Sequence, residues 1–152
     1  MKQIASFSID HTKLLPGMYL SRQDGPVSTW DIRMKRPNAG DYLSTGCLHA
    51  LEHLLATYLR NSPQSANVVY VGPMGCRTGF YVLTQGLSPT QALSLVTEGF
   101  RLCAAHWGLI PGATEAECGN YRDMDPQAAV REAAAMYEVL TEWSPARMQY
   151  EK

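Results

Sequence analysis

The chain contains a short segment in which two imidazoles and a carboxylate recur at helical spacing. His49 and His53 are four residues apart, and Glu52 lies between them. At about 100° per residue, helix positions four apart lie about 40° apart on one face, so both imidazoles can reach one metal ion. Glu52 lies about 60° from His49. From there a carboxylate can take a proton from a metal-bound group without being a ligand. The alternative is a leucine-rich helix with two packed or exposed histidines and an unrelated glutamate.

A catalytic ion needs a third protein ligand, and Cys118 is our candidate. It lies in a loop-like stretch, and two imidazoles with one thiolate leave the fourth tetrahedral position open for chemistry. From the residues alone, a small buried cysteine is an equally good interpretation. HxxEH is also the inverted form of the zincin motif, so a metallopeptidase in which Glu52 activates a metal-bound water molecule is a further alternative. Such peptidases take their third ligand from a distant carboxylate, so a cysteine ligand counts against that reading.

A second cysteine lies in a setting suited to acid–base work. Cys76 stands between Gly75, which lets the backbone approach a ligand closely, and Arg77, whose charge would favour a thiolate. On composition alone, an inert buried cysteine is the better interpretation of Cys76. We read Cys47 and Cys103 as packing residues.

Length and composition restrict the remaining possibilities. The 152 residues are 45% hydrophobic and 18% charged, which predicts one globular domain over residues 1–152. A formal net charge of -1 argues against a nucleic-acid surface. No apolar run is long enough to cross a bilayer, and the N-terminus lacks a signal-peptide core. We therefore expect a cytoplasmic protein with reduced cysteines and no membrane partner.

The periodicity of apolar residues predicts an α+β fold. Helical spacing predicts about three helices, and alternation or β-branched runs predict four to five strands. The mixed order favours helices packed against a largely antiparallel sheet. The expected strands cover residues 2–8, 27–34, 68–71 and 79–85, and the expected helices cover residues 45–60, 89–107 and 127–143.

Several phrases of the chain together resemble the S-ribosylhomocysteine lyase family, known as LuxS. The matching phrases occur in the family's order and extend over nearly the whole chain, so coincidence is very unlikely. They are Ser6–Thr12, Asp31–Arg33 with Pro37 and Asn38, Leu48–Leu54 with Arg60 and Asn61, Pro73–Tyr81, and Cys118–Arg122. The resemblance implies a fold like that of the mitochondrial processing peptidase class.

The resemblance also implies roles for the residues already singled out. His49, His53 and Cys118 match the family's metal ligands, with one divalent ion per subunit, expected to be Fe(II) and replaceable by Zn(II) or Co(II). Cys76 and Glu52 match its two acid–base residues. The implied reaction cleaves S-ribosylhomocysteine by carbonyl migration and β-elimination. The products are homocysteine and 4,5-dihydroxy-2,3-pentanedione, which connect the methyl cycle to autoinducer-2 synthesis and quorum sensing.

Substrate contacts and subunit organisation follow from the same resemblance. Ser6, His11 and Arg33 match positions expected to contact substrate, some of them in the pocket of a partner subunit. The implied assembly is a homodimer with active sites at the interface. Tyr70 departs from the family pattern, which has an acidic residue six positions before the cysteine. An inactive or altered-specificity metal-binding homologue is therefore the alternative to the lyase.

Overall fold

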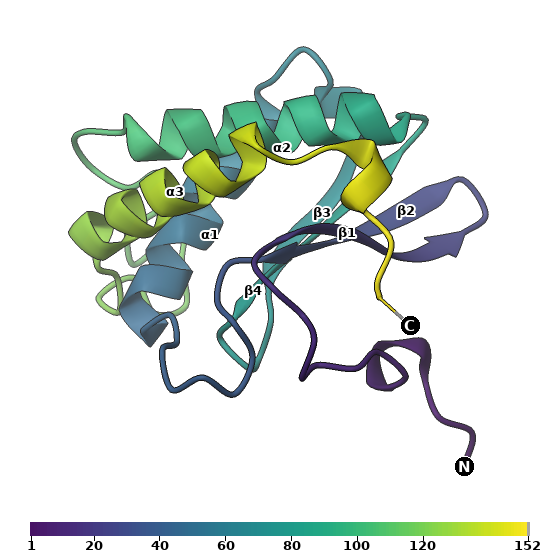
Figure 1. The fold of residues 1–152 in the computed structure, drawn as a ribbon. Helices are drawn as coiled ribbons and strands as arrows, with labels where there is room; N and C mark the ends of the chain where they lie inside the picture. Colours follow the sequence, from purple (N-terminus) through teal and green to yellow (C-terminus); the bar gives the residue numbers. More distant parts are fainter. Residues whose placement is uncertain (152) are drawn as a thin grey trace.

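A four-stranded antiparallel sheet forms the base of the molecule (Figure 1). The computed structural model describes residues 1–151. The strands lie in the order β1-β2-β4-β3, so the two hairpins meet at the centre of the sheet. Their bounds are β1 Gly17–Asp24, β2 Val27–Arg33, β3 Val68–Pro73 and β4 Gly79–Gln85.

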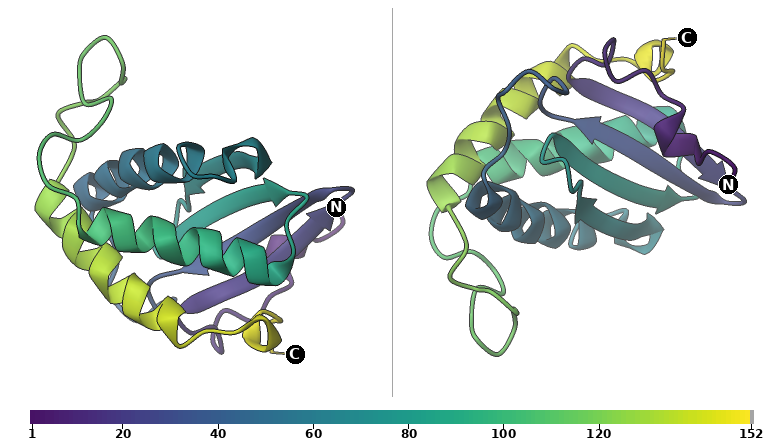
Figure 2. Two further views of the ribbon diagram at one scale, coloured as in Figure 1. Left: turned by 90° about the horizontal axis from the view of Figure 1, so that it is seen from above. Right: turned by 90° about the horizontal axis from the view of Figure 1, so that it is seen from below.

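Three helices cover one face of this sheet (Figures 1 and 2). They are α1 Thr45–Arg60, α2 Pro89–Ala104 and α3 Pro126–Thr141. Each begins at a side chain that accepts a hydrogen bond from the first turn, as Ser44 does from the Cys47 amide. Alternate strand residues face the helices, so Trp30, Ile32 and Phe80 lie in the apolar core. Within residues 1–151 no helix has the length and apolarity needed to span a bilayer.

The two ends of the chain lie on the side of the sheet away from the helices (Figure 1). The segment before β1 contains a short 3₁₀ turn, η1 Ala5–Phe7, which contacts β1. After α3 the chain forms a second short turn, η3 Pro145–Arg147, and the Leu20 amide donates to the Met148 carbonyl at 2.8 Å. The C-terminal segment is therefore attached along the free edge of β1.

The predicted α+β class with a largely antiparallel sheet is confirmed. The helix at residues 45–60 and the strand at residues 79–85 have the predicted bounds. The strand expected at residues 2–8 is wrong, because that segment is mostly exposed and turns at η1. The edge strand is β1 instead. It was not predicted, because the Pro16–Gly17 turn signal stands at its start and a bulge at Ser21 interrupts its alternation.

Candidate active site

Three potential metal ligands from two distant parts of the chain lie together. His49 and His53 stand one turn apart on α1, and Cys118 comes from the α2–α3 loop, residues 105–125. Their ligand atoms lie within 4.8 Å of one another, with Cys118 Sγ 3.3 Å from His49 Nε2. The predicted grouping of these three side chains is therefore present in the fold.

Backbone carbonyls orient both imidazoles. The Nδ1–H of His49 donates to the Asp123 carbonyl at 2.9 Å, and that of His53 donates to the Pro111 carbonyl at 2.7 Å. A carbonyl can only accept, so each Nδ1 carries a proton and Nε2 is the nitrogen left to bind a metal ion. Histidines that bind metals are usually held in this way. The donor set is therefore suited to a metal ion.

The α2–α3 loop is shaped by its own turns and by α1. The Cys118 amide donates to the Thr114 carbonyl at 3.0 Å, which forms the turn that presents the thiol. The Asp125 amide donates to the Gly46 carbonyl at 2.9 Å, which fastens the end of the loop to the start of α1. Gly112 has a φ of +73°, and a Cβ there would lie 3.0 Å from His53 Nδ1. This one loop, which projects beyond the helices in Figure 2, thus supplies the thiol and both carbonyl acceptors.

Glu52 lines an open pocket beside the three ligands. The pocket has a volume of about 360 Å³ and lies between α1 and the turn that joins β3 to β4. Its walls also include His49 and Asp123 on one side and Gly75 and Arg77 on the other. A substrate in this pocket would contact groups from both the helix and the β3–β4 turn.

Cys76 lies in the β3–β4 turn and is exposed. Arg33 Nη1 lies 3.9 Å from its sulfur and donates to Thr78 Oγ1 at 2.8 Å. Because Thr78 Oγ1 accepts from Arg33, its own hydrogen can point to the sulfur, 3.0 Å away. The guanidinium and the hydroxyl can therefore both donate hydrogen bonds to the sulfur.

The cation beside Cys76 is therefore Arg33 rather than its chain neighbour Arg77. Arg77 has a φ of +59° and donates to the Leu43 carbonyl at 3.3 Å. Its guanidinium also lies over the ring of Tyr42, 5.9 Å from the centroid. The left-handed backbone at Arg77 turns this side chain away, so adjacency in sequence was a poor guide to the charged partner.

Arg33 is itself held by a buried ion pair. It is 2% exposed, Asp31 is 1% exposed, and Arg33 Nη2 and Nε donate to the two carboxylate oxygens at 2.6 and 3.1 Å. Burial alone lowers the pKa of Arg33, but the Asp31 carboxylate more than offsets it, so the pKa lies above its ordinary value. The guanidinium therefore stays charged beside Cys76.

Ser6 and His11 lie apart from these groups. Both belong to the segment before β1, where the His11 Nδ1–H donates to the Ile9 carbonyl at 2.9 Å. This segment contacts β1 at one edge of the sheet, whereas α1 packs on β3 at the other. Figures 1 and 2 show the N-terminal segment at the opposite end of the molecule from the start of α1. The fold of one chain does not bring these two residues to the metal ligands.

Comparison with known proteins decides the family. The family model for S-ribosylhomocysteinase (LuxS) matches residues 4–147. The chain belongs to the S-ribosylhomocysteinase (LuxS) family. An S-ribosylhomocysteine lyase of Phocaeicola vulgatus is 46% identical, over 99% of this chain and 98% of the relative. The enzyme of the same name from Clostridium beijerinckii is 49% identical, over 82% of each chain. One from Borreliella burgdorferi is 40% identical over 99% of each. The resemblance inferred from the sequence is thus confirmed.

Sequence reasoning missed the groups that support the LuxS site. Asp31 carried a usable signal, because a spacing of two residues in a strand places Asp31 and Arg33 on the same face. The hydroxyl of Tyr150, which donates to Asp31 Oδ2 at 2.7 Å, carried none. The carbonyl groups of Pro111 and Asp123 could not be predicted from the sequence either, since any residue type can supply a carbonyl.

Proposed function

We propose that this chain cleaves S-ribosylhomocysteine to homocysteine and 4,5-dihydroxy-2,3-pentanedione, the precursor of autoinducer-2. It would act as a carbon–sulfur lyase, through carbonyl migration along the sugar and β-elimination. The observation that carries the proposal is the cluster of His49, His53 and Cys118 within 4.8 Å, in a chain of the LuxS family. The lyase names of the relatives support the same substrate.

We further propose that His49, His53 and Cys118 hold one divalent ion per subunit. Two imidazoles with Nε2 left to bind a metal ion and one thiol match the donor set of catalytic zinc and related sites. Fe(II) is the ion we propose, with Zn(II) or Co(II) able to replace it. When bound, the ion supplies Lewis acidity that stabilises negative charge developing on substrate oxygens.

Glu52 and Cys76 are the proposed proton carriers. Each carbonyl migration removes a proton next to a carbonyl and returns one to the neighbouring carbon, and the final elimination removes another. Glu52 would move protons through its carboxylate from the α1 side of the pocket. Cys76 would do so through its Sγ from the β3–β4 turn, where its neighbours Gly75 and Arg77 line the pocket. The Arg33 guanidinium and the Thr78 hydroxyl support this role by stabilising the thiolate.

We propose that Ser6, His11 and Arg33 contact substrate and that Ser6 and His11 do so in a partner's pocket. In one chain Ser6 and His11 lie away from the proposed ligands, so a homodimer would bring them there. Apolar side chains near them support such an interface, since Phe7 is 70% exposed and Ile4 is 54% exposed. Reduced thiols at Cys76 and Cys118 favour the cytoplasm as the location.

Mixing two inactive variants tests the shared site. A Cys76→Ala subunit keeps Ser6 and His11, and a Ser6→Ala/His11→Ala subunit keeps Cys76. If Ser6 and His11 serve the partner, the mixed dimer has one complete site and regains activity. Continued inactivity, with exchange of subunits verified by mass, would show that Ser6 and His11 act within their own subunit. Activity of the Ser6→Ala/His11→Ala variant by itself would show that they have no catalytic part.

The deciding experiment for the lyase is thiol release from S-ribosylhomocysteine, followed with a thiol-reactive dye. The protein is purified without oxygen and loaded with Fe(II) or Co(II). We expect release by the wild type, and none above background for Cys76→Ala and Glu52→Gln at full metal content. No release from fully loaded wild type would indicate an inactive homologue or another substrate, and Tyr70 would be the first position to examine.

A further inference from the structure

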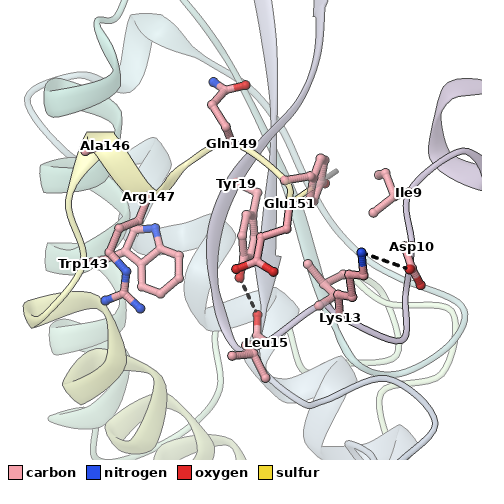
Figure 3. Close-up of a pocket in the computed structure, with 12 residues that line it drawn as sticks. Ile9, Asp10, Lys13, Leu15, Tyr19, Trp143, Ala146, Arg147, Gln149 and Glu151 are labelled. Atoms are coloured by element: carbon pink, nitrogen blue, oxygen red, sulfur yellow. Dashed lines mark hydrogen bonds and ion pairs between the residues drawn. The ribbon is translucent and has the colours of Figure 1, made fainter.

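The C-terminal segment reaches the buried ion pair behind Cys76. After η3 the chain crosses beneath β1, and the ring of Tyr150 stacks on that of Tyr19, with centroids 5.1 Å apart and planes 12° apart. Figure 3 shows Trp143, Arg147 and Glu151 around Tyr19, facing Lys13 across a pocket of about 270 Å³ that Tyr150 also lines. Tyr150 thus lies where the two ends of the chain meet.

The hydroxyl of Tyr150 belongs to a continuous chain of hydrogen bonds. It donates at 2.7 Å to Asp31 Oδ2, the oxygen that also accepts from Arg33 Nη2 at 2.6 Å. The remaining nitrogen of Arg33, Nη1, faces Thr78 and the sulfur of Cys76. Asp31 therefore fixes one side of the guanidinium while the other side faces the reactive sulfur.

The Tyr150 hydroxyl keeps its proton near neutral pH and therefore remains a hydrogen-bond donor. Burial, followed by the negative charge of Asp31, raises the pKa of Tyr150 well above its ordinary value. A neutral phenol that donates to a buried carboxylate satisfies a lone pair of that carboxylate and excludes water from it. Without the donor, water would have to take its place, and the local dielectric screening would rise.

We propose that Tyr150 is a positioning residue for Cys76, acting through the carboxylate of Asp31 and the guanidinium of Arg33. Its hydroxyl holds Asp31 in place, which holds Nη1 of Arg33 beside the sulfur. The catalytic meaning of this role rests on the proposed lyase function. The positioning of Cys76 by Tyr150 does not depend on the lyase function, because it alters the reactivity of the Cys76 thiol with or without substrate.

A simpler role for Tyr150 is to attach the C-terminal segment by its ring. Tyr150→Phe separates the two roles, because it keeps the stack on Tyr19 and removes only the hydroxyl. Tyr137→Phe is the matched control, since Tyr137 lies in α3 and packs on the core at the helix face of the sheet. Urea unfolding of each variant reports any loss of fold.

The test is the rate at which iodoacetamide modifies Cys76 in metal-loaded protein, measured by peptide mass spectrometry between pH 6 and 9. Arg33 and Tyr81 interact electrostatically with Cys76, Asp31 acts on both of them, and Arg77 is the charged neighbour in the chain. For Tyr150→Phe we expect a rate at pH 7 lower by about threefold and a profile displaced to higher pH, because water screens the guanidinium. Tyr137→Phe should match the wild type.

Turnover provides the second readout. In thiol release, kcat for Tyr150→Phe should fall by about the same factor as alkylation, since the positioned Cys76 thiol moves protons in the reaction. A wild-type alkylation profile for Tyr150→Phe would overturn the proposal and leave the tyrosine as an anchor of the segment. If the wild type releases no thiol, the lyase proposal fails, but the alkylation profile still decides the role of Tyr150.

Discussion

The two halves of the candidate site are held in different ways. Around the proposed ligands, His49 and His53 are oriented by carbonyl groups of a single loop. Around Cys76, the orientation comes from side chains of β2, of the β3–β4 turn and of the C-terminal segment. The ligand half should therefore be sensitive to the backbone path of the loop, and the thiol half to single charges and hydroxyls.

Removing one sulfur from each half should separate metal binding from proton transfer. Cys118→Ser should lose most of its metal and all measurable turnover, because a hydroxyl is a poor ligand for a borderline ion. Cys76→Ser should keep the metal and lose turnover by about 10²–10⁴-fold, as expected for a lost acid–base group. Metal content by elemental analysis and thiol release are measured on the same samples. Equal metal loss in the two variants would contradict the division into halves.

Breaking the buried ion pair should be the most damaging change to stability. Asp31→Asn leaves the Arg33 guanidinium buried without its counter-charge, which typically costs about 3–5 kcal/mol. Asp24→Asn breaks the exposed pair with Arg22 and should cost far less, because solvent screens that pair. Urea unfolding of the apoprotein compares the two variants. Similar losses would mean that burial adds nothing to the Asp31 pair.

A methyl group placed in the loop should weaken metal binding without touching a ligand. Gly112→Ala strains a positive φ and brings a Cβ to 3.0 Å from His53 Nδ1. Gly108→Ala strains a similar φ of +93° with nothing within 4 Å of the new Cβ. Because disturbing the partners of ligands typically costs about 10–100-fold in affinity, we expect about a tenfold loss of Co(II) affinity for Gly112→Ala alone, measured by chelator competition. A matching loss in Gly108→Ala would attribute the effect to backbone strain.

The smallest expected effect concerns the cysteines outside both halves. Burial raises the pKa of Cys47 to about 11 and that of Cys103 to about 12, from an ordinary value of 9.0. Folding favours their protonated forms, so their contribution to stability is complete below about pH 9 and is lost as the pH rises through those values. The urea midpoint should fall between pH 8 and 10.5, and the fall should be smaller for Cys103→Ala. An equal fall in that variant would exclude Cys103 as a cause.

Much of the fold and of the ligand set could be predicted from local pattern. The helix at residues 45–60 combines Ser44 as its cap with a leucine stripe, so its bounds and the facing histidines followed from spacing. Cys118 was reached from chemistry, because an open tetrahedral site needs a third donor. The strand β1 was missed, since a bulge between Leu20 and Arg22 breaks its alternation of apolar and polar residues.

The groups that orient the Cys76 side chain could not be predicted from the residues near it in the sequence. Arg33 meets the sulfur only because β2 pairs with β4 and places Arg33 opposite Gly79. Tyr150 meets Asp31 only because the chain returns under the sheet after α3. Both contacts depend on tertiary structure, and neither is encoded in the residues next to Cys76.

The α2–α3 loop has a consequence for how the chain can change over generations. Its acceptors are carbonyls, so most substitutions between Pro111 and Asp123 leave both histidine contacts available. An insertion or deletion there would displace a carbonyl and the Cys118 thiol together. Substitutions in this loop away from Gly112 and from Cys118–Arg122 should therefore be tolerated better than any change in its length.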